Sequence, residues 1–236
     1  MNYKLTTSPS PVLSDTYRHR GLRQKLVNTL RRKGIRDEKV LQAISIIPRH
    51  FMLDKAFSDW AYKDMAFPID ADQTISMPYT VALQSQLLKI QKGDKVLEVG
   101  TGSGYQAAVL YTMGAKVYSI ERQRKLFVKT SELLVHMSMQ GIRTLYGDGY
   151  EGAPRFAPFD KIVVTAGASI FPDKLLAQLK IGGIMVIPVD SGQGQEMIRY
   201  VKTAEGSCRK ENHGPCAFVP MLGLSLIHIS EPTRPY

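Results

Sequence analysis

Two glutamates and three glycines near the middle of the chain have the spacing of a nucleoside-binding site. Glu98 lies just before a G-x-G-x-G motif formed by Gly100, Gly102 and Gly104, and Glu121 follows about 20 residues later. Glycine allows positive φ and lets the backbone approach a ligand closely. A carboxylate at the position of Glu121 can accept hydrogen bonds from both hydroxyls of a ribose. Together these residues predict a loop that binds a nucleoside.

The glycine spacing also narrows the class of nucleoside. The motif is neither G-x-G-x-x-G nor G-x-x-x-x-G-K-[ST], so a pyrophosphate cradle is less well supported than a nucleoside. Glu98 would repel a pyrophosphate but would suit a cationic group, and a nucleoside that carries a sulfonium fits this arrangement. The alternative is that the glycines only form turns in an ordinary α/β protein. Glu121 makes that interpretation the weaker one.

The residues around the motif predict how the chain positions it. The apolar run over residues 96–99 suits a buried parallel strand, and residues 105–113 have the composition of a helix that follows the glycine loop. Further strands are expected over residues 116–120, 143–146, 160–166 and 183–188. Strands that alternate with helices predict an α/β fold with a doubly wound, mostly parallel, Rossmann-like sheet.

Ligands of such sheets bind beyond the carboxyl ends of the strands. Glu98, Glu121 and Asp148 and the residues from Thr165 to Gly167 follow or end four successive predicted strands, so we expect them at one edge. Residues 195–203 and 216–221 are expected to complete the sheet as antiparallel edge strands.

A helical addition is predicted before the sheet. Ser14 or Asp15 can cap a first helix that ends at Gly34, and a second helix runs from Asp37 to Pro48. Residues 64–79 form a long link without a pattern, and a loop of this length in a compact protein is often functional. A third helix is expected over residues 79–90.

These observations divide the chain into four parts. Residues 1–13 form an N-terminus that we expect to be disordered, and residues 14–90 hold the helices and the loop, packed on the core. Residues 91–223 form the nucleoside-binding α/β domain. Residues 224–236 resemble translated sequencing-adapter read-through, and we expect this tail to be non-native.

The composition of the chain limits its possible locations and binding partners. The 236 residues are 44% hydrophobic without an apolar run of membrane-span length, and the N-terminus lacks a secretory signal, so we expect a cytoplasmic monomer. The net charge of +10 invites a nucleic-acid partner, but residues 1–55 hold twelve Lys or Arg against four Asp or Glu on helices with polar outer faces. We therefore expect neither nucleic acid nor membrane as a partner. The spacing of Cys208 and Cys216 does not indicate a metal site, and we interpret His50 as a packing or capping residue.

Several segments accompany the glycine motif in a fixed order. They are DEKVL at 37–41, IPRHF at 47–51, AFPI at 66–69, QTISMP at 73–78 and FVPML at 218–222. With these segments the chain resembles the protein-L-isoaspartate O-methyltransferases over about residues 17–223. The glycine motif alone indicates only a class I methyltransferase. The T-I-S-x-P loop that precedes it narrows the resemblance from that class to this one family.

The resemblance implies a cofactor, a substrate and site residues. S-adenosyl-L-methionine would be the methyl donor, and the acceptor would be the carboxylate of an L-isoaspartyl residue in a damaged protein or peptide. The product is a methyl ester that closes to a succinimide. The residues implied to bind the cofactor are Ile75, Glu98, Gly100, Thr101, Gly102, Glu121, Asp148 and Gly149. Thr74, Ser76 and Pro78 would form the substrate loop, with Ser76 as the catalytic residue, and no metal is implied.

This chemistry needs no general base. An isoaspartyl carboxylate with a pKa near ~4 is ionised at neutral pH, so the protein has only to hold oxygen, methyl carbon and sulfur in line and exclude water. Ser76 would serve as an orienting hydrogen-bond donor. The alternative for Ser76 is a cap for the helix that Pro78 opens, and both roles can coexist.

Two other functions stay open at this point. A class I methyltransferase for a small molecule or RNA would share the donor site without needing the Thr74–Ser76 loop. A non-catalytic donor-binding or interaction protein is suggested by Asp70 and Asp72, which stand where the family usually has glycines, and by the unusual tail. Met77, in place of a frequent glutamine, is a further departure from the family pattern. Methyl transfer to an isoaspartyl peptide, compared with its aspartyl twin, discriminates among the three.

Overall fold

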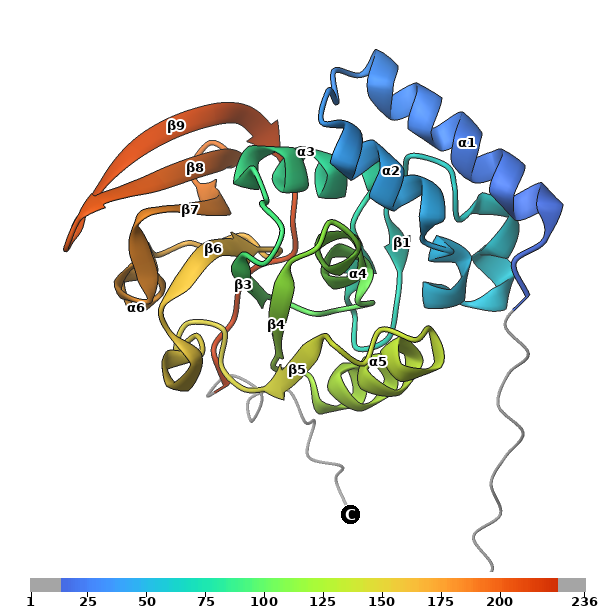
Figure 1. Cartoon of the computed structure of the whole chain (residues 1–236). Coiled ribbons are helices and arrows are strands. Elements are labelled where there is room, and N and C mark those ends of the chain that lie inside the picture. Colours follow the sequence, from blue (N-terminus) through green and yellow to red (C-terminus); the bar gives the residue numbers. More distant parts are fainter. Residues whose placement is uncertain (1–13, 225–236) are drawn as a thin grey trace, which may run out of the picture.

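A seven-stranded sheet forms the centre of the molecule, in a computed structural model that describes residues 14–224 (Figure 1). The predicted N-terminus at 1–13 and all but the first residue of the predicted tail therefore lie outside the described residues. The strand order is β5-β4-β3-β6-β7-β8-β9. The bounds are β3 Lys95–Val99, β4 Lys116–Glu121, β5 Arg143–Tyr146, β6 Phe159–Val164, β7 Leu179–Asp190, β8 Gln195–Ala204 and β9 Ser207–Cys216.

The first five strands of this order are parallel, and β8 and β9 are antiparallel, which confirms the predicted doubly wound, mostly parallel sheet. The prediction that residues 216–221 form the last edge strand is wrong. The edge strand is β9, which follows β8 after a tight turn at Gly206, where φ is +70°. Because β9 is polar and largely exposed, it lacks the apolar alternation by which strands are recognised.

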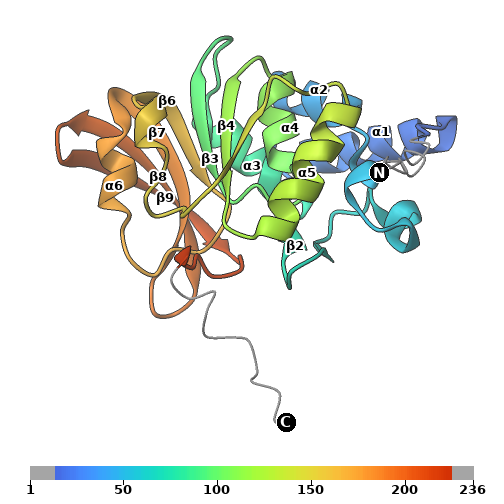
Figure 2. The ribbon, with the colours of Figure 1, turned by 90° about the horizontal axis from the view of Figure 1, so that it is seen from below.

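The sheet has an apolar core on each face because side chains alternate along its strands. Val96, Val163 and Val186 point into the core beneath the larger helical layer, whereas Leu97 and Ile162 point into the opposite core. The larger layer contains α1 Tyr17–Arg32, α2 Glu38–Ile46, α3 Pro78–Leu88, α4 Tyr105–Thr112 and α5 Arg124–His136. The short α6, Asp173–Ala177, covers the opposite face, so that the sheet lies between two layers (Figure 2).

The predicted helical addition is present at the N-terminal side. The side chain of Thr16, rather than Ser14 or Asp15, caps α1, and Asp37 caps α2 as expected. Two 3₁₀ helices follow, η1 Arg49–Met52 and η2 Lys55–Trp60, and a third, η3 Pro154–Phe156, precedes β6. Within residues 14–224, no helix is long and apolar enough to cross a membrane.

The link between residues 64 and 79 is more ordered than its sequence suggests. It contains a small antiparallel hairpin of β1 Phe67–Pro68 and β2 Thr74–Ile75. Ala71 and Asp72 turn the hairpin with φ of +59° and +53°. Asp70 at the turn accepts hydrogen bonds from Lys125 and Lys129 of α5, both at 2.6 Å, so the hairpin is fastened to the sheet domain.

Candidate active site

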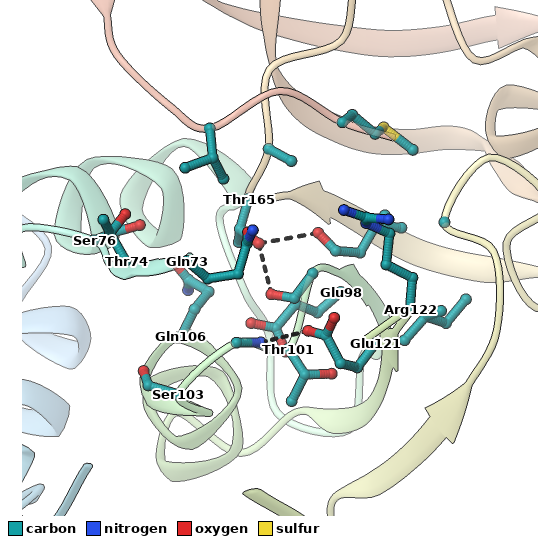
Figure 3. Close-up of a pocket in the computed structure, with 18 of the residues that line it drawn as sticks. Gln73, Thr74, Ser76, Glu98, Thr101, Ser103, Gln106, Glu121, Arg122 and Thr165 are labelled. Atoms are coloured by element: carbon teal, nitrogen blue, oxygen red, sulfur yellow. Dashed lines mark hydrogen bonds between the residues drawn. The ribbon is translucent and has the colours of Figure 1, made fainter. Parts of the chain in front are cut away.

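A pocket lies where the carboxyl ends of the central strands meet. The loop after β3 forms its floor, the start of α4 and the end of β4 form its sides, and the loop after β2 borders it (Figure 3). Of the residues predicted from the sequence, those that line this pocket are Thr74, Ile75, Ser76, Glu98, Gly100, Thr101, Gly102, Glu121, Gly149, Thr165 and Ala166.

Two positions of the pocket wall require glycine because neighbouring side chains leave no room for a Cβ atom. Gly100 has a φ of +100°, and a Cβ atom there would lie 2.4 Å from Oγ1 of Thr165. That hydroxyl donates to the carbonyl oxygen of Gly100 at 2.6 Å, which joins the loop after β3 to the end of β6. At Gly149 a Cβ would lie 2.5 Å from a methyl group of Val99. A larger residue at either position would push the pocket wall apart.

Glu121 ends β4 with its carboxylate against the glycine loop. Its Oε2 accepts the N–H of Gly102 at 2.8 Å, and its Oε1 accepts the N–H of Gln123 at 2.8 Å. The side chain is buried, so both oxygens are held in a fixed position at the pocket. A carboxylate oxygen can accept more than one hydrogen bond, and each oxygen therefore retains capacity for a hydroxyl of a ligand.

Glu98 is fully buried in the pocket wall. Its Oε2 accepts a hydrogen bond from the Ser119 hydroxyl at 2.5 Å, and the hydroxyl oxygen of Ser119 lies 2.6 Å from that of Thr101. Burial raises the pKa of Glu98 to about 8, although the Ser119 hydrogen bond opposes the shift, and the nearby charge of Glu121 adds to it. The Oε1 atom has no partner among the described residues. In its ionised form this side chain is complementary to a cation with N–H donors.

Ser76 follows β2 and faces the pocket with its hydroxyl unbonded. Among residues 14–224 it has no hydrogen-bond partner, and the N-cap of α3 is Met77, without a side-chain cap bond. The first turn of α3 is instead capped by Asp64, whose Oδ1 accepts the N–H of Tyr79 at 2.7 Å. The interpretation of Ser76 as a helix cap is therefore wrong, and its hydroxyl is available to a ligand.

Two of the predicted site residues lie outside the pocket lining. Pro78 is buried as the first residue of α3. Asp148 lies beside Gly149, but its side chain accepts the backbone N–H groups of Tyr150 at 2.9 Å and Leu224 at 2.8 Å. Asp148 therefore shapes the turn after β5 and fastens the chain beyond β9 to it.

The structure also places in the pocket residues that the sequence did not identify as site residues. They are Gln73, Val81, Val99, Ser103, Tyr105, Gln106, Ile120, Arg122 and the segment 219–222. The segment crosses the end of the sheet because Gly167 donates to Val219 and accepts from Met221, both at 2.8 Å. The FVPML sequence carried only the family resemblance. Ser103 lies within the glycine motif and Gln73 within the QTISMP segment, but neither was assigned a role, and the remaining residues stand in no motif whose chemistry indicates a ligand.

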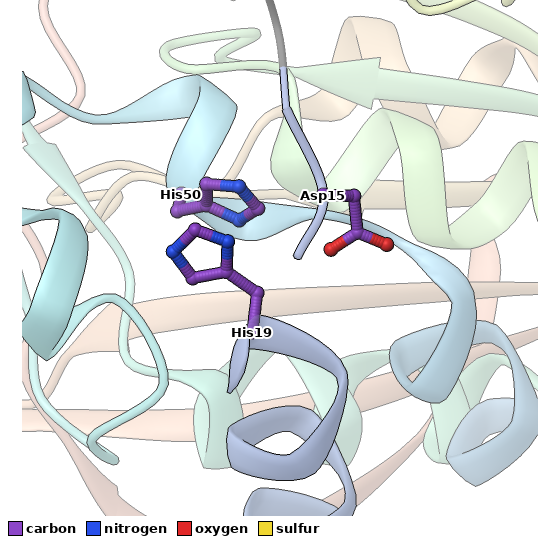
Figure 4. A group of neighbouring side chains, drawn as sticks. All are labelled: Asp15, His19 and His50. Atoms are coloured by element: carbon purple, nitrogen blue, oxygen red, sulfur yellow. The ribbon is translucent and has the colours of Figure 1, made fainter. Parts of the chain in front are cut away.

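A second group of titratable side chains lies at the start of α1 (Figure 4). The rings of His19 and His50 stack at 3.7 Å, and Asp15 lies beside them. The carboxylate of Asp15 accepts hydrogen bonds from both terminal nitrogens of Arg23, at 2.8 and 2.7 Å. Both ring nitrogens of His50 are engaged, by the Tyr62 hydroxyl at 2.6 Å and by the Ser14 carbonyl at 3.1 Å. The group therefore fastens α1 to η1, in agreement with a packing role for His50, and offers no free set of metal ligands.

Comparison with known proteins identifies the family. The model of the protein-L-isoaspartate(D-aspartate) O-methyltransferase family matches residues 21–225. The protein-L-isoaspartate O-methyltransferases of Christiangramia forsetii and Flavobacterium psychrophilum are 57% and 54% identical over 210 residues, which cover 89% of this chain and 98% of each relative.

Solved structures agree with this assignment. A protein-L-isoaspartate O-methyltransferase superposes with a TM-score of 0.78 at 28% identity, over 86% of this chain and 66% of that chain. A second structure, described as a protein-L-isoaspartate O-methyltransferase from Plasmodium falciparum in complex with S-adenosyl-L-homocysteine, shares the fold with a TM-score of 0.74 at 23% identity, over 86% of this chain and 98% of that chain. The chain belongs to the protein-L-isoaspartate O-methyltransferase family.

Proposed function

We propose that the pocket binds S-adenosyl-L-methionine and transfers its methyl group to the carboxylate of L-isoaspartyl residues in damaged proteins and peptides. The observation that carries this proposal is the meeting of two parts in one pocket. The glycine loop with Glu98 and Glu121 supplies a donor site, and Ser76 brings an unbonded hydroxyl to the same space. Membership of the family supports both the donor and the acceptor.

The donor site is built from groups that match a cationic nucleoside. Glu121 would accept the two ribose hydroxyls, and its hydrogen bond to Gly102 positions it for this. Glu98 would face the charged amino-acid part, since its Oε1 is buried without a partner among the described residues. Gly149 would lie against the adenine, in a turn that Asp148 holds.

The donor supplies an electrophilic methyl group on a sulfonium, and the acceptor supplies a carboxylate that is already ionised at neutral pH. The described residues that line the pocket include no His, Cys or Lys, and its two carboxylates, Glu98 and Glu121, are assigned here to the donor. Ser76 would donate a hydrogen bond to one carboxylate oxygen and leave the other directed at the methyl carbon. Orientation of this kind lowers the activation barrier, because the entropy of aligning the two groups is already lost on binding and is not lost again in the transition state.

The two unusual aspartates do not argue for a non-catalytic protein. Lys125 and Lys129 hold the pKa of Asp70 down at about 2, and their two charges face its carboxylate. Neither Asp70 nor Asp72 lines the pocket. An anionic acceptor would therefore not meet an unpaired carboxylate of Asp70 at the entrance.

The proposed acceptor is tested by methyl transfer from labelled S-adenosyl-L-methionine to two peptides that differ only in an isoaspartyl or an aspartyl linkage. We expect base-labile methyl ester on the isoaspartyl peptide alone. Equal labelling of both peptides, or of neither in a protein that binds S-adenosyl-L-homocysteine, would contradict the proposed acceptor.

Three further properties stay predictions from the sequence. We infer that the protein is a monomer, that it acts in the cytoplasm, and that its macromolecular partners are isoaspartyl proteins rather than nucleic acids. Light scattering of the purified chain tests the first, cell fractionation tests the second, and retention on immobilised RNA or DNA would contradict the third.

A further inference from the structure

Gln106, the second residue of α4, has a side chain whose orientation the structure fixes. Its Nε2 donates to Oγ of Ser85 at 2.9 Å, and the Ser85 hydroxyl donates to the carbonyl oxygen of Val81 at 2.8 Å. Because the only hydroxyl proton of Ser85 goes to Val81, Ser85 can only accept from Gln106. The carbonyl end of the Gln106 side chain is therefore the end that remains free.

This free oxygen is buried in the same pocket as Glu98. Gln106 is 5% exposed and lines the pocket, and its Oε1 has no hydrogen-bond partner among the described residues (Figure 3). Oε1 of Glu98 is likewise buried without a hydrogen-bond partner among the described residues. A buried acceptor without a donor is unfavourable, so this wall is complementary to a group with several N–H donors.

We propose that Gln106 binds the α-ammonium group of the methyl donor, beside the Glu98 carboxylate already assigned to the amino-acid part. This inference rests on the proposed function. The donor carries two cationic groups, but the sulfonium has no N–H or O–H bond and cannot satisfy an acceptor. The ammonium has three N–H donors and can reach two acceptors at once. Gln106 is then a binding residue that fixes the amino-acid part of the donor, while Glu121 fixes its ribose.

Two ligands that differ in the amino-acid part test the proposal by calorimetry. S-adenosyl-L-homocysteine carries the ammonium, whereas 5′-methylthioadenosine keeps the nucleoside and thioether but lacks the amino acid. For Gln106→Leu we expect affinity for the first ligand to fall at least about tenfold, because a hydrogen bond to a charged group is lost. Affinity for 5′-methylthioadenosine should stay within about twofold of the wild type.

Gln84→Leu is the matched control, because Gln84 is also a buried glutamine but does not line the pocket. Its Nε2 donates to the carbonyl oxygen of Val164, and we expect its loss to leave both affinities unchanged. If Gln106→Leu does not fold, Gln106→Met keeps the side-chain length and takes the same two titrations.

Equal weakening of both ligands by the Gln106 variant, or unchanged affinity for S-adenosyl-L-homocysteine, would overturn the role of Gln106. A wild-type protein that binds neither ligand would instead overturn the proposed donor site, and this inference with it.

Discussion

Glu98 is the residue whose protonation state links donor binding to pH. Its pKa is raised to about 8 by burial, so in the protein without donor it is mostly protonated at neutral pH. An ammonium group beside it favours the ionised form. We predict that binding of S-adenosyl-L-homocysteine at about pH 7 releases close to one proton, and that affinity rises from about pH 6 to about pH 7.5.

Calorimetry in buffers of different ionisation enthalpy measures this proton directly. Glu98→Gln should bind more weakly and without proton release, and proton release that persists in this variant would remove Glu98 as its source.

The raised pKa of Glu98 also affects the stability of the fold. Because the folded pKa of about 8 lies above the ordinary value, the contribution of Glu98 to stability declines as pH rises from about 4.3 towards about 8.

Glu121 provides a second prediction for a single residue. Glu121→Ala removes the carboxylate proposed to accept the ribose diol and also the acceptor that holds the N–H of Gly102. We expect affinity for S-adenosyl-L-homocysteine to weaken by about 1.5–3 kcal/mol, the range for hydrogen bonds to charged groups. Calorimetry that shows unchanged affinity would take Glu121 out of the donor site.

Sequence reasoning identified the residues whose type and spacing are unusual. Glu98 and Glu121 stand out because carboxylates at strand ends beside glycines are uncommon outside binding sites. Gln106 and Arg122 did not stand out, since a glutamine on an apolar helix and an arginine after a strand have many ordinary roles. Their place in the pocket depends on side-chain orientation, which no local pattern encodes.

At the scale of elements, the β1–β2 hairpin depends on a tether to α5. The carboxylate of Asp70 accepts hydrogen bonds from Lys125 and Lys129, both at 2.6 Å, and these lysines lower its pKa to about 2. Because the folded pKa is below the ordinary value, the contribution to stability is present above about pH 4 and is lost as pH falls through about 2.

We predict that Asp70→Asn increases amide exchange in β1 and β2 while lowering global stability by less than about 1 kcal/mol, as for other exposed ion pairs. Hydrogen exchange measured by NMR tests this, with Asp72→Asn as the matched control because Asp72 has no ion pair among the described residues. Unchanged exchange in the Asp70 variant would mean that the hairpin is held by other contacts.

The elements show where local sequence patterns are sufficient. Buried strands such as β3 and β6 were placed within one or two residues, because their apolar runs are covered on both faces. The polar β9 was missed, and the segment at residues 216–221 was assigned as a strand although it crosses the pocket. A two-residue hairpin is also below the length at which periodicity can be detected.

At the scale of the whole molecule, the central sheet and the candidate pocket both lie within residues 14–224. Leu224, which we assigned to a non-native tail, donates its N–H to Asp148 at 2.8 Å. We predict that a chain ending at Leu224 keeps the melting temperature and donor affinity of the full chain, because the sheet and pocket lie within residues 14–224. A large drop in melting temperature would show that residues 225–236 contribute native structure.

We propose that the molecule accelerates methyl transfer by orienting an ionised carboxylate, with Ser76 as the orienting donor. The most direct test is kcat of Ser76→Ala on an isoaspartyl peptide, measured together with its affinity for S-adenosyl-L-homocysteine and its thermal unfolding. We predict that kcat falls on the order of 10²-fold while donor affinity and stability stay close to wild type, since Ser76 has no bond to lose among the described residues. Wild-type kcat in a folded Ser76→Ala protein would contradict this account.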